Sequence, residues 1–340
     1  MDGPRIGFCC TFVSPEGDAE QQRALNMRQP TVASVARSEN PAARLEEVIL
    51  ENLDVLDRQI AYVASLPKLE RLFRILSGFL VGWSHPAIAG AWTSDLRAEV
   101  ERRLAITGET ARSTDVRLSM HPAQHAILAS NNEGAIGNAL NDIEEHAEIF
   151  AMLGYGDGWH PLGASVNIHG GAKSAGLDSL RANLMRLSEE ARNLLTIEND
   201  EISFGVDDLL QVGEDVALIV DFHHHWVHSR GEWLQPEDPR IERIAASWRG
   251  VRPLAHISVS RESYLGDHDP DALPDFMLLE GTGLGASKLR GHSDRMWNSA
   301  VNEFVAHHLA WTDVEVEAKA KNLASADLAA HVRASEMLPA

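Results

Sequence analysis

Eight short apolar runs recur along the chain, and this spacing limits its fold more than any other feature. They cover residues 5–12, 71–76, 115–121, 164–170, 194–199, 216–223, 253–260 and 313–320. Runs of this length that alternate with helical stretches are typical of parallel strands buried on both faces. Right-handed crossovers leave few ways to close such a chain. We therefore predict an α/β fold, a single-domain (β/α)₈ TIM barrel over residues 1–340.

The segments between the runs predict helices and three long loops. Apolar residues at spacings of three and four are clearest over 41–66, 132–153, 177–195 and 294–310. Long connections at about 14–40, 226–237 and 262–291 follow the first, sixth and seventh runs. Loops after barrel strands carry active sites. The last connection is rich in glycine but lacks the lysine and serine of a Walker motif, so we interpret it as a flexible lid.

Charge and composition restrict the partners. The 50 acidic residues outnumber 30 basic ones, which gives a formal charge of −20 and disfavours a simple nucleic-acid binder. A site that gathers divalent cations would supply positive charge of its own, however. No apolar stretch approaches the roughly 20 residues that cross a bilayer. Without a leader-like start, and with adjacent Cys9 and Cys10 poorly placed for a disulfide, we expect a cytoplasmic protein. We also expect a monomer.

Histidines and carboxylates stand at the ends of six runs, where barrel strands deliver catalytic groups. The candidates at these ends are His121, His169, Glu198, Asp221, His224, His256 and Glu317, and His292 is an eighth candidate in the loop between the last two runs. So many acids and imidazoles on one barrel face would be unstable without cations between them. Imidazole nitrogen and carboxylate oxygen suit ions such as Mn²⁺ and Zn²⁺, and one carboxylate commonly bridges two ions.

We therefore predict a polynuclear metal site with Glu198 as the bridge. His121 and His169 would complete the coordination of the first ion, while Asp221, His256 and Glu317 would hold the second. His224 and His292 could hold a third, and Glu198, His224 and His292 are predicted to be catalytic. A single buried histidine is more often a hydrogen-bonded core residue than a ligand. That reading accounts for one or two of these residues but not for the whole succession. No Ser-His or Cys-His triad is identifiable, which disfavours nucleophilic catalysis.

The order of these motifs resembles the UV damage endonuclease family, relatives of the metal-dependent AP endonucleases. The segments that carry the resemblance are FRILSGFLVGWSHP (73–86), LSMHPAQ (118–124), NIHGGAK (167–173), IEND (197–200), DFHHH (221–225), HIS (256–258), HSD (292–294) and EAKAK (317–321). The resemblance implies a (β/α)₈ barrel with up to three divalent ions, usually manganese. It also implies a nick immediately 5′ to a DNA lesion, which leaves a 3′ hydroxyl. The ligands that it implies are the eight residues given above.

The chain departs from the family pattern where the family recognises its lesion. The family's Tyr and Asn on the first strand correspond to Phe8 and Phe12, and its Gln-Tyr probe pair corresponds to Gln124 and His125. These four residues are our candidates for substrate binding. A lysine that some members modify, two positions before the seventh-strand histidine, is replaced by Leu254.

The leading functional prediction is a metal-dependent DNA repair endonuclease. It would hydrolyse a phosphodiester 5′ to a UV-type or related lesion in damaged double-stranded DNA. Two to three divalent ions are expected, with Mn²⁺ ahead of Zn²⁺, Fe²⁺ and Mg²⁺. One alternative keeps the metals but acts on a small molecule, as a sugar isomerase, an epimerase or an iron-dependent oxidative enzyme. Another is a metal-stabilised binding module without turnover.

Overall fold

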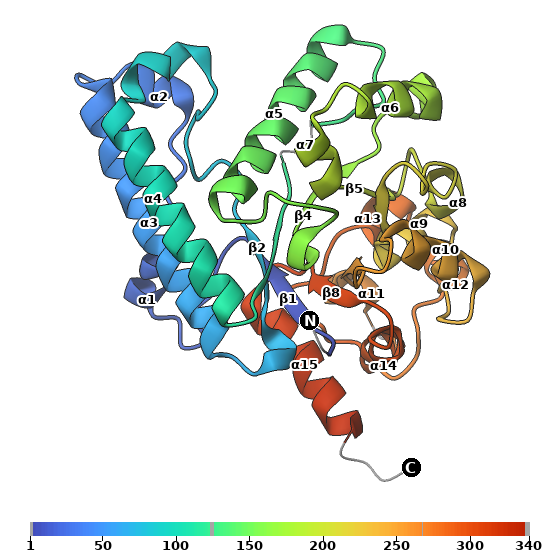
Figure 1. Ribbon diagram of the computed structural model, residues 1–340. Coiled ribbons are helices and arrows are strands. Elements are labelled where there is room, and N and C mark those ends of the chain that lie inside the picture. The colour runs from blue at the N-terminus through green and yellow to red at the C-terminus, as the bar shows by residue number, and fades with distance from the viewer. Residues whose placement is uncertain (1–2, 123–125, 267, 337–340) are drawn as a thin grey trace.

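The computed structural model describes residues 3–122, 126–266 and 268–336. Eight strands lie at its centre with helices packed around them (Figure 1). The strands are β1 (Ile6–Cys9), β2 (Leu72–Ile75), β3 (Arg117–Met120), β4 (Ser165–His169), β5 (Leu195–Glu198), β6 (Ala217–Ile219), β7 (Leu254–Ile257) and β8 (Asp313–Val316). Each falls inside one of the predicted runs and is shorter than that run.

All strand pairs are parallel, in the order β6-β5-β4-β3-β2-β1-β8-β7. The two ends of this sheet meet at a single parallel bridge between Asp221 and His256, where the His256 amide donates to the Val220 carbonyl at 2.9 Å. The sheet is therefore a nearly closed barrel, and the predicted TIM-barrel fold is confirmed.

The helices differ from the prediction mainly in the connections. The α-helices are α1 (Ala19–Ala24), α2 (Val32–Ala36), α3 (Pro41–Ser65), α4 (Ser94–Ser113), α5 (Glu133–Met152), α6 (Gly176–Leu184), α7 (Glu189–Leu194), α8 (Val206–Leu209), α9 (Phe222–His228), α10 (Pro239–Ser247), α11 (Glu262–Leu265), α12 (Phe276–Gly281), α13 (Ala286–Leu289), α14 (Ser299–His308) and α15 (Asn322–Glu336). Short 3₁₀ turns are η1 (Lys68–Glu70), η2 (Pro86–Ala91), η3 (Pro161–Gly163) and η4 (Lys173–Ala175).

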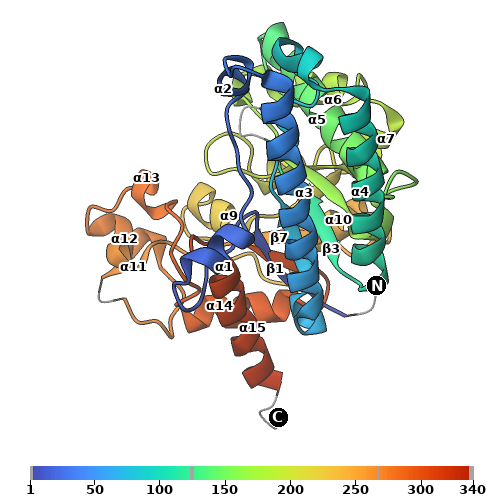
Figure 2. The same ribbon diagram turned by 90° about the vertical axis from the view of Figure 1, so that its left-hand side faces the viewer.

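Each predicted long loop contains or overlaps helical structure. The 14–40 connection contains α1 and α2, the 226–237 connection begins inside α9, and the 262–291 connection contains α11, α12 and α13. The helix expected over 177–195 is two helices, α6 and α7. Figure 2 shows α11–α13 as a group set to one side of the barrel, away from α3 and α4.

The two faces of the barrel strands carry different chemistry. Outward residues such as Phe73, Ile168 and Ile197 are buried in the core that contacts the helices. Inward residues are often polar, and they contact one another across the barrel from strands that are not neighbours. Arg74 on β2, for example, reaches His256 on β7. The barrel interior is therefore a polar site surrounded by an apolar layer.

A buried charge network closes the amino-terminal end of the barrel. Asp313 on β8 lies 2.8 Å from Arg117 and 2.7 Å from Arg252, and it accepts the backbone amide of Arg5 at 2.9 Å. The side chains of Arg5, Arg117 and Asp313 are all fully buried. This network lies at the opposite end of the strands from the histidines and carboxylates. At that end of a barrel, buried charges contribute to stability rather than to chemistry.

One helix contact gives a test of the packing between α4 and α5. A Cβ added to Gly108 on α4 would lie 1.9 Å from the carbonyl oxygen of Leu153, the residue that ends α5. Gly108→Ala is therefore expected to lower the free energy of unfolding by about 1–3 kcal/mol, because the helices would have to separate. Gly137→Ala on α5 is the control. A Cβ there meets nothing within 4 Å, so the higher helix propensity of alanine should stabilise the protein by up to about 1 kcal/mol. Urea denaturation of both variants tests this, and equal effects would contradict the packing.

Within the residues that the structure describes, no helix combines the length and apolar character needed to span a membrane.

Candidate metal centre

Six strands of the barrel each deliver one side chain to the carboxyl-terminal mouth. His169 and Glu198 end β4 and β5, and His256 lies within β7. His121 and Glu317 each follow the last residue of a strand, β3 and β8. Asp221 follows β6 and begins α9 as its N-cap, where its side chain accepts the amide of His224 at 2.6 Å. Asp221 is thereby oriented by the helix that it starts.

The first group of candidate ligands is His121, His169 and Glu198. Nε2 of His121 lies 3.7 Å from Oε2 of Glu198, and the two imidazole rings are 5.4 Å apart between centroids. Nδ1 of His121 lies 2.8 Å from the carbonyl of Pro122. Because a carbonyl only accepts, Nδ1 carries the proton and Nε2 keeps a lone pair for a ligand.

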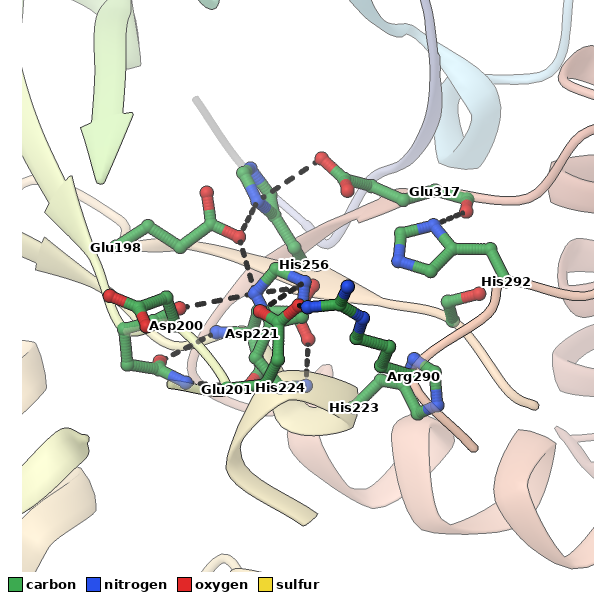
Figure 3. A network of polar contacts seen from close by, with 12 residues as sticks. Glu198, Asp200, Glu201, Asp221, His223, His224, His256, Arg290, His292 and Glu317 are labelled. Carbon is green, nitrogen blue, oxygen red and sulfur yellow. Dashed lines mark hydrogen bonds and ion pairs between the residues drawn. The ribbon is translucent and has the colours of Figure 1, made fainter. Parts of the chain in front are cut away.

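The second group is Glu198, Asp221, His256 and Glu317, so Glu198 belongs to both groups. Nδ1 of His256 lies 3.0 Å from Oε1 of Glu198 and 3.5 Å from Oε1 of Glu317. Figure 3 shows the His256 ring between these two carboxylates, with Asp221 and His224 beside it. A carboxylate shared by two ligand groups has the geometry of a bridging ligand.

The chemistry of these atoms fits divalent cations. Oε1 of Glu198, Oδ2 of Asp221 and Nδ1 of His169 are buried and make no hydrogen bond within the described part of the chain. Burying such atoms without a partner is costly, and cations bound to the two ligand groups would supply partners for them. The donor set of carboxylate oxygen and imidazole nitrogen suits manganese, zinc or iron.

The electrostatics of the site also favour positive charge. Burial alone would raise the pKa of Glu198, but His256 and His169 outweigh it and hold this pKa well below its usual range. Burial alone would lower the pKa of His256, but Glu198 and Glu315 raise it to about 10. Burial raises the pKa of Asp221. The site thus stabilises an ionised Glu198 and a positive charge at His256, whereas the charge on Asp221 is disfavoured by its burial.

His224 and His292, the expected ligands of a third ion, lie beside these groups. Nδ1 of His224 is 3.4 Å from Oε1 of Glu198 and 3.1 Å from the carbonyl of Asn199. Nδ1 of His292 lies 2.5 Å from the carbonyl of Glu317, and its ring centroid is 6.0 Å from that of His224. Among the described residues, neither histidine belongs to a ligand group, so the third ion stays a prediction.

Two charged residues of the site were absent from the sequence prediction. The guanidinium of Arg74 donates to Glu315 at 2.7 Å and to Glu317 at 2.6 Å, and its Nη2 lies 2.7 Å from Nε2 of His256. Glu315 also accepts from the hydroxyl of Ser119. Strand alternation could have identified Glu315, because it shares a face with Glu317 two residues later.

The expected substrate-binding residues lie elsewhere or outside the described residues. Phe8 and Phe12 are each 3% exposed. Phe8 packs against Phe73 at 5.2 Å, and Phe12 packs against Tyr62 at 5.0 Å. Phe8 faces outward from β1 into the core between the barrel and its helices, and both rings are covered by neighbouring aromatic side chains. Gln124 and His125 lie outside the described residues.

Leu254, which stands where some family members have a modified lysine, is fully buried among apolar side chains of the barrel interior. It contacts the cluster that includes Leu72, Ile219 and Trp248. Position 254 therefore supplies apolar packing beneath the metal centre.

A groove leads away from the first ligand group. Its volume is about 750 Å³, and its walls come from the β2–α4 connection and from α5. His121 lines the groove together with Ser77, Asn138, Asn141 and Asp142. A bound molecule could thus reach the candidate ligands from the surface.

Comparisons with known proteins identify relatives of this chain. The chain is 31% identical over 201 residues to the UV-damage endonuclease of Neurospora crassa. The aligned region makes up 55% of this chain but only 30% of that protein. It is 26% identical over 272 residues to the UV DNA damage endonuclease of Bacillus velezensis, which covers 77% of this chain and 79% of that one.

A solved structure, SacUVDE, has the same fold, with a TM-score of 0.74 at 20% identity over 98% of this chain and all of that one. The model of the UV-endonuclease UvdE family matches residues 4–338. The resemblance found in the motifs is therefore confirmed, and this chain is a member of the UV-endonuclease UvdE family.

Proposed function

We propose that this chain is a metal-dependent DNA repair endonuclease that hydrolyses a phosphodiester bond 5′ to a UV-type or related lesion. One observation carries the proposal: two ligand groups share Glu198 at the mouth of the barrel, in a chain of this family. The named activity of the relatives supports DNA as the substrate.

The residues of the site divide the work. Bound divalent ions would supply the charge that activates water and neutralises a phosphate. Glu198 would bridge them, with His121 and His169 on one side and Asp221, His256 and Glu317 on the other. Asn167 donates a hydrogen bond to Oε2 of Glu198 and so fixes the orientation of the bridge. Neutral imidazoles whose protons are held by backbone carbonyls would direct lone pairs inward.

The loops around the mouth offer positive charge despite the acidic total. Lys173 follows β4, Lys288 lies in the connection after β7, and Lys319 follows β8, and all three side chains are exposed. Lysines near the path of a nucleic-acid backbone would contact phosphates. We propose that these loops position the duplex while the groove beside His121 admits distorted nucleotides.

Ultraviolet-irradiated supercoiled plasmid tests this function. We expect the purified protein to contain two or three divalent ions per chain by elemental analysis and to nick irradiated plasmid with Mn²⁺. Unirradiated plasmid should stay supercoiled, and stripping with chelator should abolish nicking until metal is restored.

A gel-shift assay on damaged and undamaged duplex distinguishes the proposed endonuclease from a metalloenzyme that acts on a small molecule. Protein that holds metal but does not bind either duplex at low salt would contradict the endonuclease proposal and favour a small substrate. A metal-free protein with full nicking would contradict the proposed metal centre.

A further inference from the structure

His256 is oriented opposite to three other histidines of the metal centre, His121, His224 and His292. His121, His224 and His292 each place Nδ1 against a backbone carbonyl, at 2.8, 3.1 and 2.5 Å. Nδ1 of His256 instead faces the carboxylates of Glu198 and Glu317. His256 would therefore bind a metal ion through Nδ1, whereas the other three would use Nε2.

This orientation sets a requirement at the other nitrogen. A neutral imidazole has one N–H and one lone pair, so a metal ion at Nδ1 requires the proton on Nε2. That N–H is fully buried with the rest of the side chain and needs an acceptor. The closest polar group, Nη2 of Arg74 at 2.7 Å, is a donor and cannot accept. The next is Oε2 of Glu315, at 3.4 Å.

Glu315 is held in place for this role. It is fully buried on β8, level with His256 in the strand pairing. Oε1 accepts from the hydroxyl of Ser119 on β3, and Oε2 accepts from Arg74 on β2. Partners on two other strands therefore fix the orientation of this carboxylate.

We propose that Glu315 is the positioning carboxylate of His256. Its carboxylate accepts a hydrogen bond from the Nε2–H of His256. The lone pair of Nδ1 is then directed at the ion held by Glu198, Asp221 and Glu317. The guanidinium of Arg74 then turns from His256 and keeps its bonds to Glu315 and Glu317. This inference rests on the proposed metal centre and adds to it a residue that contacts a ligand without being one.

Glu315 has two possible roles: to accept the hydrogen bond from Nε2–H of His256, or only to balance the charge of Arg74. Two variants distinguish these roles. Glu315→Gln retains an acceptor oxygen but loses the charge, whereas Glu315→Leu loses both. Mn²⁺ binding is measured by isothermal titration without DNA. We expect Glu315→Leu to weaken binding about 10- to 100-fold, as removal of an outer partner of a metal-bound histidine does. Glu315→Gln should remain within a few-fold of wild type.

A matched control is Glu70→Gln, which neutralises a nearly buried carboxylate paired with Arg333 at 2.6 Å. Glu70 precedes β2, at the amino-terminal end of the barrel. Its metal affinity should equal that of wild type. Equal losses in the two Glu315 variants, or wild-type affinity in Glu315→Leu, would overturn the proposal.

The tautomer of His256 is a second readout, and it is measured on the wild-type protein. ¹⁵N NMR of the Zn²⁺-loaded wild-type protein, with the signals assigned by comparison with His256→Gln, should show the proton on Nε2. A proton on Nδ1, or no binding of Mn²⁺ or Zn²⁺ to wild type, would refute the inference. Because both measurements omit DNA, failure to nick would count against the proposed function and leave this result intact.

Discussion

Glu198→Gln is expected to reduce nicking of irradiated plasmid by about 1,000-fold or more, which corresponds to a barrier increase of about 4 kcal/mol. The reason is that Glu198 is the one residue common to both ligand groups. An amide can offer one oxygen to one ion but cannot bridge two as a carboxylate does. Rates are measured at saturating Mn²⁺, so that a change in affinity alone does not explain the loss.

The same substitution should leave the fold intact. In metal-free buffer the variant should stay folded but melt below the wild-type temperature, because His256 and His169 lose the carboxylate whose ionised form they stabilise. Added Mn²⁺ should raise the melting temperature of wild type much more than that of the variant. Glu303→Gln is the control, since Glu303 also faces imidazoles, those of His307 and His331, but on the outer helices α14 and α15. Nicking by Glu198→Gln within ten-fold of the control would contradict the bridging role.

The strands were the most predictable part of this molecule. A strand covered by helices reads as an apolar run in the sequence, and all eight strands lie within the predicted runs. The predicted runs extend beyond the ends of the strands, because residues after a strand, such as Asp221, already belong to the next element. Helix α4 was not singled out, since only the first half of its buried stripe carries large apolar residues and the second half consists of Thr107, Gly108 and Ala111.

The candidate ligands could be predicted because each lies at the same end of its strand. Arg74 and Glu315 could not be found in this way, since they are inside the barrel and their role depends on contacts across it. The alternation from Glu317 indicates only that Glu315 faces inward. The orientation of Phe8 was equally hidden, because an aromatic residue at a strand end gives no sign of whether it faces the ligand or the helices.

Asp313→Asn should produce the largest loss of stability, about 3–5 kcal/mol in the free energy of unfolding. Asp313 is fully buried and lies within ion-pair distance of Arg5, Arg117 and Arg252. An asparagine of the same shape would direct an N–H at one of these donors. Two of the guanidinium groups, those of Arg5 and Arg117, would then be fully buried with less compensating charge. Urea denaturation measures this loss, and Glu99→Gln, which breaks the exposed pair with Arg102, should change nothing measurable.

The folded fraction of Asp313→Asn should still bind Mn²⁺ with wild-type affinity. Asp313 is the first residue of β8, whereas Glu317 follows its last residue, so the network and the metal centre occupy opposite ends of one strand. Glu198→Gln and Asp313→Asn should therefore have complementary effects, the first mainly on nicking and metal binding, the second on stability with metal binding retained. Loss of metal affinity in folded Asp313→Asn protein would show that the two ends of the barrel are coupled and that the buried charges at its base help to shape the site.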